Sequence, residues 1–243
     1  MILEAEHLAK SFGGVRALAD VSFSVGAGEL LAMIGPNGAG KTTCFNLLNG
    51  QLRADAGSIR VEGLDIEHLP PRKRFRLGVG RTFQVAATFG SMTVRENVQL
   101  ALLSRERRLG SLWSSLGGAG EAAQLLARVG MSEQAHQPCA TLAYGDLKRV
   151  ELAIALAGRP RLLLMDEPTA GMAPEERGEL MRLATGLARE LGLAVLFTEH
   201  DMEVVFGHAD RVIVLAEGVI IAEGPPADIR AHAKVQEVYL GNV

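Results

Sequence analysis

Cysteine, aromatic residues and long apolar runs are all scarce in this chain. Its 243 residues include two cysteines and one tryptophan, and aromatic residues make up only 5% of the sequence. Cys44 and Cys139 lie too far apart to suggest a disulfide scaffold or a metal-binding spacing, and so few cysteines suit a reducing cytosol. The low aromatic content argues against a base-stacking platform for single-stranded nucleic acid.

The charge balance and the lack of membrane signals further limit the class of protein. The formal net charge is -3 and 48% of the residues are hydrophobic. No basic field is present to attract nucleic acid, so we expect no nucleic-acid partner. No run approaches the roughly 18 apolar residues of a membrane span, and no signal peptide is apparent. We therefore expect a soluble chain that reaches a membrane only through a partner.

The stretch 35–43 reads Gly-Pro-Asn-Gly-Ala-Gly-Lys-Thr-Thr and matches the P-loop pattern G-x-x-x-x-G-K-[ST]. The apolar run 29–34 before it predicts a buried strand, and a helix is expected from Lys41. Glycines let backbone N–H groups turn toward an anion, and the helix N-terminus adds partial positive charge. The predicted nucleotide-binding residues are Gly35, Asn37, Gly38, Ala39, Gly40, Lys41, Thr42 and Thr43.

Within this motif two side chains carry chemistry. Lys41 is expected to reach the β- and γ-phosphates, and Thr42 offers a hydroxyl to Mg²⁺. Cys44 follows directly. A position near a helix N-terminus could lower the pKa of its thiol and make it reactive, but ordinary packing in the core is the favoured role.

A second group of polar residues follows two later apolar strands. Asp166 and Glu167 come after four apolar residues, and His200 follows the apolar run 193–197. At the carboxyl ends of strands, where α/β sheets bind ligands, Asp166 can hold Mg²⁺ through water. Glu167 can accept a proton from an attacking water, and His200 can contact the γ-phosphate or that water. A lone histidine is often a bystander, but its position at this edge favours a function.

Strand and helix patterns alternate at both ends of the chain, with a helical block between them. This order predicts a parallel-sheet core carrying a helical insertion. The core is expected at residues 1–84 and 160–243, and the helical part at 85–159. Strands are predicted at residues 2–8, 19–25, 29–34, 57–61, 78–84, 161–166, 193–198, 211–215 and 219–223. Helices are predicted at 70–76, 94–103, 121–129, 147–157 and 174–191, with one or two more at 226–240.

With these parts in order, nearly the whole chain resembles the ATP-binding subunits of ABC transporters. The resemblance rests on the Walker A stretch 35–43, Gln84, the Walker B strand 162–166 with Glu167, His200 and the signature region. The signature region consists of Leu142, Ala143, Tyr144, Gly145 and Asp146. The resemblance implies a single α/β domain with a P-loop NTPase (RecA-like) core, a mostly parallel sheet, an N-terminal antiparallel β part and an inserted α-helical subdomain.

The family also implies roles for residues that the bare sequence leaves open. ATP and Mg²⁺ are the expected cofactors, with Lys41, Glu167 and His200 as the catalytic residues. Gln84 joins Thr42 and Asp166 as a metal ligand, and the signature region binds nucleotide across a dimer interface. Phe12 suits core packing or stacking on a base from its residue type alone, and the family favours stacking on adenine.

A narrower similarity points to importers of branched-chain amino acids. Residues 81–84, 170–172, 199–202 and 238–241 look like that subgroup. It implies an ATPase, hydrolysing ATP to ADP and phosphate, that is peripheral at the cytoplasmic face of the inner or plasma membrane. The implied partners are integral-membrane permease subunits, a second ATPase subunit (a paralogue or a second copy) in a head-to-tail dimer, and an extracytoplasmic solute-binding protein.

Several alternatives stay open. Urea and amide importers share these motifs, and lipid exporters share the Tyr-Leu-Gly ending, although residues 81–84 favour import. A soluble ABC protein of translation or DNA repair usually carries two cassettes or a long coiled coil. A P-loop kinase or GTPase would leave residues 142–146 without a role. The loop 110–120 around Trp113 is either flexible or a docking edge.

The chain departs from the family pattern at three positions that would face a partner subunit. Ala143 stands where the family has Ser, Asp146 where it has Gln, and Ala173 where many members have Asp. A Ser hydroxyl would donate to the γ-phosphate, a contact of about 1.5–3 kcal/mol for a charged acceptor. We therefore expect an asymmetric heterodimer in which one ATP site is weakened. The alternative is that the Gly145 backbone and the helix N-terminus suffice.

Overall fold

The computed structural model describes residues 1–82, 88–106 and 118–240. Within them ten strands form one sheet, in the spatial order β5-β4-β1-β2-β10-β9-β3-β8-β7-β6. The strands are β1 (Leu3–Phe12), β2 (Val15–Val25), β3 (Leu30–Ile34), β4 (Ala56–Val61), β5 (Leu64–Asp65), β6 (Val79–Thr82), β7 (Leu162–Asp166), β8 (Ala194–Thr198), β9 (Arg211–Ala216) and β10 (Val219–Gly224).

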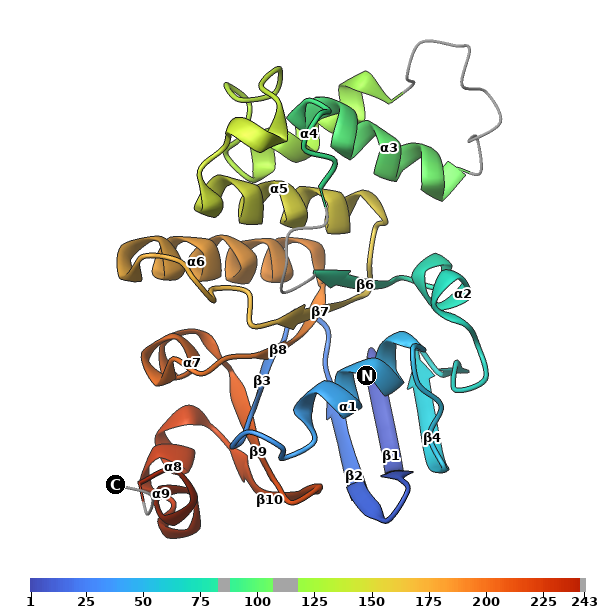
Figure 1. The fold of residues 1–243 in the computed structure, drawn as a ribbon, viewed down its shortest axis with the longest axis vertical. Coiled ribbons are helices and arrows are strands. Elements are labelled where there is room, and N and C mark those ends of the chain that lie inside the picture. Colours follow the sequence, from blue (N-terminus) through green and yellow to red (C-terminus); the bar gives the residue numbers. More distant parts are fainter. Residues whose placement is uncertain (83–87, 107–117, 241–243) are drawn as a thin grey trace.

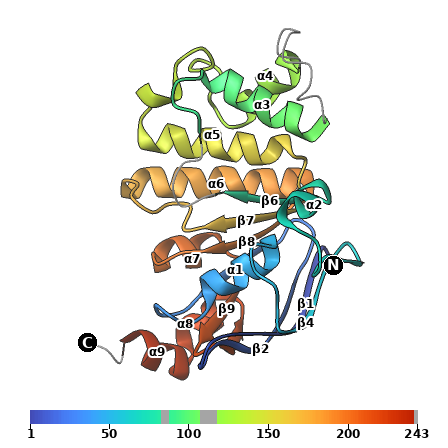
Figure 2. The same cartoon turned by 45° about the vertical axis from the view of Figure 1, so that its right-hand side comes forward.

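Nine α-helices are found in the described part of the chain. They are α1 (Lys41–Asn49), α2 (Pro71–Arg76), α3 (Val94–Glu106), α4 (Ala119–Arg128), α5 (Tyr144–Ala157), α6 (Pro174–Leu191), α7 (Met202–His208), α8 (Pro226–Ala231) and α9 (Ala233–Leu240). Helices α3, α4 and α5 stack as a block beyond α6, while α7, α8 and α9 lie at the opposite end near β9 and β10 (Figure 1, Figure 2). None of these helices combines the length and the apolar character needed to cross a membrane.

Strand direction divides the sheet into the two parts that the sequence predicts. β9, β3, β8, β7 and β6 run parallel to one another, whereas β10 pairs antiparallel with β9 and β1 pairs antiparallel with both β2 and β4. The parallel strands are nearly continuous apolar runs because both of their faces are covered. The predicted fold class is confirmed: a mostly parallel P-loop core, an N-terminal antiparallel part and an inserted helical block.

Side chains of β3 alternate between two buried clusters, as the two-residue period of a strand requires. Leu30, Ala32 and Ile34 belong to a cluster that includes the helical block, whereas Leu31 and Met33 pack with α1 and the N-terminal strands. The helical block therefore shares one apolar core with the sheet. The predicted boundary of a separate helical subdomain at residues 85–159 stays a prediction.

Most predicted elements are present, but their ends differ in places. β2 begins at Val15 rather than at residue 19, because Phe12 and Val15 pair directly across the tight turn at Gly13 and Gly14. α5 begins at Tyr144 rather than at residue 147, since Ala143 already has the extended backbone of an N-cap residue. α7 was not anticipated from the sequence. Residues 84 and 110–117, on which two predictions fall, lie outside the described residues.

Cys44 is fully buried on the sheet-facing side of α1. Burial raises the pKa of its thiol to about 12. A reactive thiolate is therefore excluded, because loss of solvent outweighs the effect of the nearby helix N-terminus. Cys44 serves as a small apolar side chain in the core, as the favoured interpretation predicted.

The end of α1 is fixed by a buried arginine on α2. Arg74 is only 1% exposed, and its guanidinium donates to the backbone oxygens of Leu47 and Leu48 at this helix end, where carbonyl groups lack intrahelical partners. Gly50 closes the helix with φ of 83°, and a Cβ there would lie 2.7 Å from Arg74 Nε. This cap holds the helix that carries the P-loop at a fixed length and angle.

Candidate functional site

The predicted phosphate-binding loop lies between β3 and α1, as the sequence pattern indicates. β3 ends at Ile34 and α1 begins at Lys41, so residues 35–40 form the connection. Gly40 has φ of 108°, and a Cβ there would lie 2.5 Å from the backbone oxygen of Ala17. This path therefore requires glycine. Free N–H groups in the first turn of α1 open onto the loop, as an anion site needs.

Exposure of the loop residues suits a ligand that covers them. Asn37, Gly38 and Thr42 are exposed, Thr43 is half-buried, and Ala39 is buried beneath the loop. Thr42 follows the lysine at the start of α1 and is exposed beside the loop. A hydroxyl residue at this position suits a cation that is bound by phosphates in the loop.

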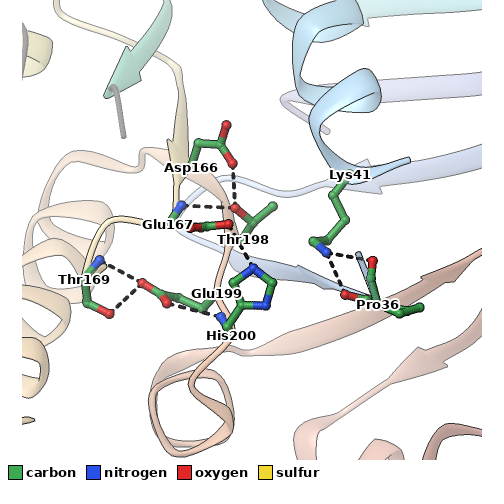
Figure 3. A network of polar contacts seen from close by, with 9 residues as sticks. Pro36, Lys41, Asp166, Glu167, Thr169, Thr198, Glu199 and His200 are labelled. Carbon is green, nitrogen blue, oxygen red and sulfur yellow. Dashed lines mark hydrogen bonds and ion pairs between the residues drawn. The ribbon is translucent and has the colours of Figure 1, made fainter. Parts of the chain in front are cut away.

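Lys41 folds back over this loop. Its Nζ donates to the backbone oxygens of Gly35 at 2.6 Å and Pro36 at 3.1 Å (Figure 3). Burial lowers the pKa of Lys41, and the negative charges of Glu167 and Asp166 act in the opposite direction. The P-loop and the end of β7 thus share one electrostatic environment. A phosphate in the loop would offer the ammonium a charged and therefore stronger acceptor than a carbonyl oxygen.

Asp166 is fixed at the end of β7 by two donors from neighbouring strands. In the ladder between β7 and β8, Asp166 stands opposite Thr198, whose Oγ1 donates to Asp166 Oδ1 at 2.8 Å. Arg81 Nη2, on β6, donates to Asp166 Oδ2 at 3.2 Å. Arg81 also reaches Asn46 Oδ1 on α1, at 3.0 Å. This arginine connects the predicted metal ligand to the helix that follows the P-loop.

Glu167 has a left-handed backbone, with φ of 48°. Such a conformation costs a non-glycine residue on the order of 1–3 kcal/mol, so surrounding contacts must hold it. Its N–H donates to Thr198, with 3.1 Å to Oγ1 and 3.2 Å to the backbone oxygen. The side chain then meets His200, whose Nε2–H donates to Glu167 Oε1 at 2.9 Å (Figure 3). The structure thus brings the predicted general base and the predicted histidine into direct contact.

A buried carboxylate anchors the turn that follows Glu167. Glu199 is 4% exposed, and its Oε1 accepts from Thr169 N at 2.8 Å and from Thr169 Oγ1 at 2.7 Å. Burial raises the pKa of Glu199, although hydrogen bonds from Thr169 and from the His200 N–H oppose this shift. From the sequence, Glu199 was part of a family motif but had no predicted contact. Its partner, Thr169, lies three residues after Asp166, and the pair becomes apparent only when β7 and β8 are aligned.

Asp201 begins the unanticipated helix α7. It accepts hydrogen bonds from the N–H groups of Glu203 and Val204 as an N-cap, and Arg177 Nη1 on α6 donates to its Oδ2 at 2.7 Å. Arg177 Nε also donates to the backbone oxygen of Met172. An aspartate directly before an apolar run is a helix-start signal, so the sequence alone could have predicted α7.

The signature region forms the start of α5, apart from the P-loop. Ala143 is the N-cap residue and makes no side-chain cap, and Tyr144 lies beside Gly171. A Cβ at Gly145 would lie 3.2 Å from the carboxyl carbon of Glu176, so this helix end sits close to α6. Among the described residues, no hydrogen bond or ion pair joins the signature region to the P-loop. Leu142 and Asp146 are half-buried in the same part of the structure.

One predicted nucleotide contact, Phe12, stands apart from this centre, and another lies outside the described residues. Phe12 ends β1, is 46% exposed and has Lys10 Nζ 5.6 Å from its ring centroid. An exposed ring suits stacking on a base better than core packing, and the stacking role stays a prediction. Gln84, the third predicted metal ligand, lies outside the described residues.

The oxygen donors near the loop fit a magnesium ion that is bound mainly by phosphates. Across the described ranges no group of three metal-binding side chains gathers. Mg²⁺ in nucleotide sites uses one or two protein oxygens together with substrate phosphates and water, so no such group is required. Thr42 and Asp166 supply a hydroxyl and a carboxylate of the right kind.

The sheet, the loop and the acidic strand ends define a P-loop nucleotide-binding protein. The family model for ABC transporters matches residues 18–170, and a model named branched-chain amino acid ATP-binding cassette transporter matches residues 219–243. The chain therefore belongs to the ATP-binding cassette proteins of ABC transporters.

Known relatives and solved structures match this chain over almost its full length. The high-affinity branched-chain amino acid transport ATP-binding protein BraF of Pseudomonas aeruginosa is 38% identical, covering 99% of this chain and 98% of that protein. The corresponding protein LivG of Escherichia coli is 37% identical, with the same coverage. The crystal structure of a nucleotide-free ATP-binding cassette from an ABC transporter has a TM-score of 0.88 at 31% identity, covering 98% of each chain.

Glu199→Ala should lower the rate of ATP hydrolysis about 10- to 100-fold, because the turn that carries Glu167 loses its buried acceptor and the base moves out of line. ATP binding should change little, since the P-loop is untouched. Phosphate release and nucleotide affinity are the two measurements.

Glu237→Ala, which removes an exposed carboxylate from α9, is the matched control and should keep full activity. A Glu199 variant that hydrolyses ATP at the normal rate would show that the Thr169 contact does not position the base.

Proposed function

We propose that this chain hydrolyses ATP to ADP and phosphate to power a membrane importer of branched-chain amino acids. The observation that carries the catalytic part is the meeting of Glu167, His200 and Asp166 in the electrostatic environment of Lys41. The family supports ATP as the nucleotide. The solute class is supported by the names of the relatives and by the model that matches residues 219–243.

Each residue then has a distinct part in hydrolysis. Lys41 and the N–H groups of the loop bind the β- and γ-phosphates and stabilise the charge that develops during transfer. Glu167 accepts a proton from the attacking water, a contribution of about 10²- to 10⁴-fold in rate. His200 orients the Glu167 carboxylate through its N–H and is placed to sense the γ-phosphate.

Mg²⁺, held by Thr42 and Asp166 with Gln84 as the proposed third ligand, would neutralise phosphate charge when bound. The Arg81 guanidinium now occupies Asp166 Oδ2, while Oδ1 is fixed by Thr198. Both contacts hold the carboxylate in a single orientation at the loop. A preset orientation lowers the cost of ordering this ligand around the cation.

The proposed assembly is a head-to-tail pair of ATPase subunits beneath two permease subunits, at the cytoplasmic face of the membrane, with an extracytoplasmic solute-binding protein. In it, Leu142, Ala143, Tyr144, Gly145 and Asp146 contact the nucleotide held by the partner's loop. The position of this region apart from its own P-loop supports such an arrangement, since an intact site needs a second subunit. Urea or amide import is the second candidate because such importers share these motifs, whereas lipid export shares only the Tyr-Leu-Gly ending at residues 239–241.

A pull-down from native membranes tests the proposal. Glu167→Gln should bind Mg-ATP but hydrolyse it about 10²- to 10⁴-fold more slowly, and so hold the closed dimer. Mass spectrometry of the tagged variant should then identify two hydrophobic permeases and a second ATPase. Recovery of ribosomes or nucleic-acid proteins, with nothing from the membrane, would contradict the importer.

Ala143→Ser tests the asymmetry of the two ATP sites. The new hydroxyl should raise single-turnover hydrolysis at the partner subunit's P-loop by about tenfold, the effect of one hydrogen bond to a charged group. Because Ala143 is the N-cap of α5, serine should also stabilise the chain by about 1 kcal/mol.

Ala143→Asp is the matched control, since aspartate caps a helix about as well as serine does but has no hydroxyl to donate to the γ-phosphate. It should give a similar gain in stability without the same gain in rate. If Ala143→Ser leaves the partner site's rate unchanged, the asymmetric heterodimer is wrong and the helix N-terminus suffices for the γ-phosphate.

A further inference from the structure

A cavity of about 220 Å³ lies between α7 and the two C-terminal helices. It is smaller than the roughly 300–1,000 Å³ of pockets for drug-sized ligands, so it suits a small molecule. Its apolar lining comes from four separate elements: Ile34 ends β3, Met202 and Phe206 lie on α7, Ile229 lies on α8 and Val235 on α9.

Aliphatic groups dominate this lining, with one aromatic ring at the side of α7. Ile34 is fully buried, Ile229 is 1% exposed and Val235 is 6% exposed, whereas Met202 and Phe206 are half-buried. The deep part of the cavity is therefore branched and apolar, and its outer part opens beside α7. A branched aliphatic side chain is the group that such a lining would remove from water most favourably.

One charged residue lines this cavity, and a second of opposite sign lines an adjoining hollow. Arg230 lines it together with Gln236, and its guanidinium lies 5.9 Å from the ring centroid of Phe206. An adjoining hollow shares Met202, Phe206 and Arg230 and adds Glu203 to the lining. Both Arg230 and Glu203 are exposed. A guanidinium for a carboxylate and a carboxylate for an ammonium, next to an aliphatic cavity, match the three groups of an aliphatic α-amino acid.

We propose that this cavity binds an aliphatic α-amino acid of leucine size, with its carboxylate on Arg230, its ammonium on Glu203 and its side chain among Ile34, Ile229 and Val235. An aliphatic side chain of another protein would bring neither of the two charges, and a fatty acid would bring only the carboxylate. The chemical class of the ligand follows from this lining and these two charges. The role of the bound amino acid as a signal of imported solute rests on the proposed function.

The position of the cavity connects it to the catalytic site. α7 begins two residues after His200, and Ile34 is the last residue before the P-loop. An amino acid bound here would touch both elements and hold α7 in the position in which His200 contacts Glu167. Because a ligand stabilises the state that binds it better, we expect the occupied site to slow opening of this contact and so to lower ATP turnover.

Titration of the purified, nucleotide-free chain with L-leucine, followed by calorimetry, tests the site directly. Leucine should bind with a Kd at or below about 1 mM. 4-Methylpentanoate, which lacks the ammonium, and 3-methylbutylamine, which lacks the carboxylate, should each bind at least about tenfold more weakly. Absence of saturable leucine binding, or equal binding of all three compounds, would overturn the proposal.

Variants of the two charged residues distinguish specific recognition of leucine from a general effect of surface charge. Arg230→Gln and Glu203→Gln should each weaken leucine binding about tenfold or more. Lys234→Gln removes an exposed charge from the same helical pair and should leave the Kd unchanged. Equal losses in all three variants would contradict specific recognition.

The regulatory part is measured as ATP hydrolysis by the purified transport complex. Leucine at saturation should lower turnover about fivefold, at the lower end of usual coupling between sites. Arg230→Gln should keep its turnover in leucine, and an unaffected wild-type rate would overturn the regulatory role. The binding titration needs no transporter, so it is independent of the importer proposal. Leucine binding without any co-purifying permease would refute the importer and not the cavity site. Co-purifying permeases without leucine binding would refute the cavity site and not the importer.

Discussion

The register between β7 and β8 is the constraint on which the candidate site depends. It sets Asp166 opposite Thr198, and one hydroxyl then serves both acids by donating to Asp166 and accepting from the Glu167 N–H. Since side chains alternate along a strand, a shift by one residue would turn Thr198 away from both acids and into the core. The apolar residues of the two strands are buried on both faces of the sheet. Their packing holds this register, because a slipped strand would gain no better contacts.

From this register the contacts spread in two directions. Glu199 and Thr169 tie the turn after Glu167 to the end of β8, and Arg177 joins α6 to the start of α7 through Asp201. The candidate base is therefore placed by residues on several elements rather than by its own strand. The same connections lead from the γ-phosphate side of the site to α7 and on to the cavity beneath the C-terminal helices. A change in nucleotide or in cavity occupancy would act on one connected group of contacts.

Local sequence patterns predicted the parts of the site that depend on neighbouring residues. The P-loop, the acids after β7 and the histidine after β8 each follow from a motif, and periodicity predicted most strands and helices. The contacts of Arg81 with Asp166 and of Glu199 with Thr169 join residues 85 and 30 positions apart. Such pairs depend on strand order and register, which no single motif encodes. The start of α5 was misplaced because Tyr, Gly and Asp are weak helix formers, and the sequence left a reactive Cys44 open because burial is a tertiary property.

Thr198→Val in the purified transport complex tests the central claim most directly. Valine keeps the shape of threonine and removes only the hydroxyl that holds Asp166 and Glu167. Single-turnover hydrolysis should fall about 10- to 100-fold while ATP affinity changes by less than about threefold, because the base is displaced and the P-loop is not. A normal hydrolysis rate, or a loss of ATP binding that accounts for the whole effect, would contradict the claim that this hydroxyl positions the catalytic carboxylate.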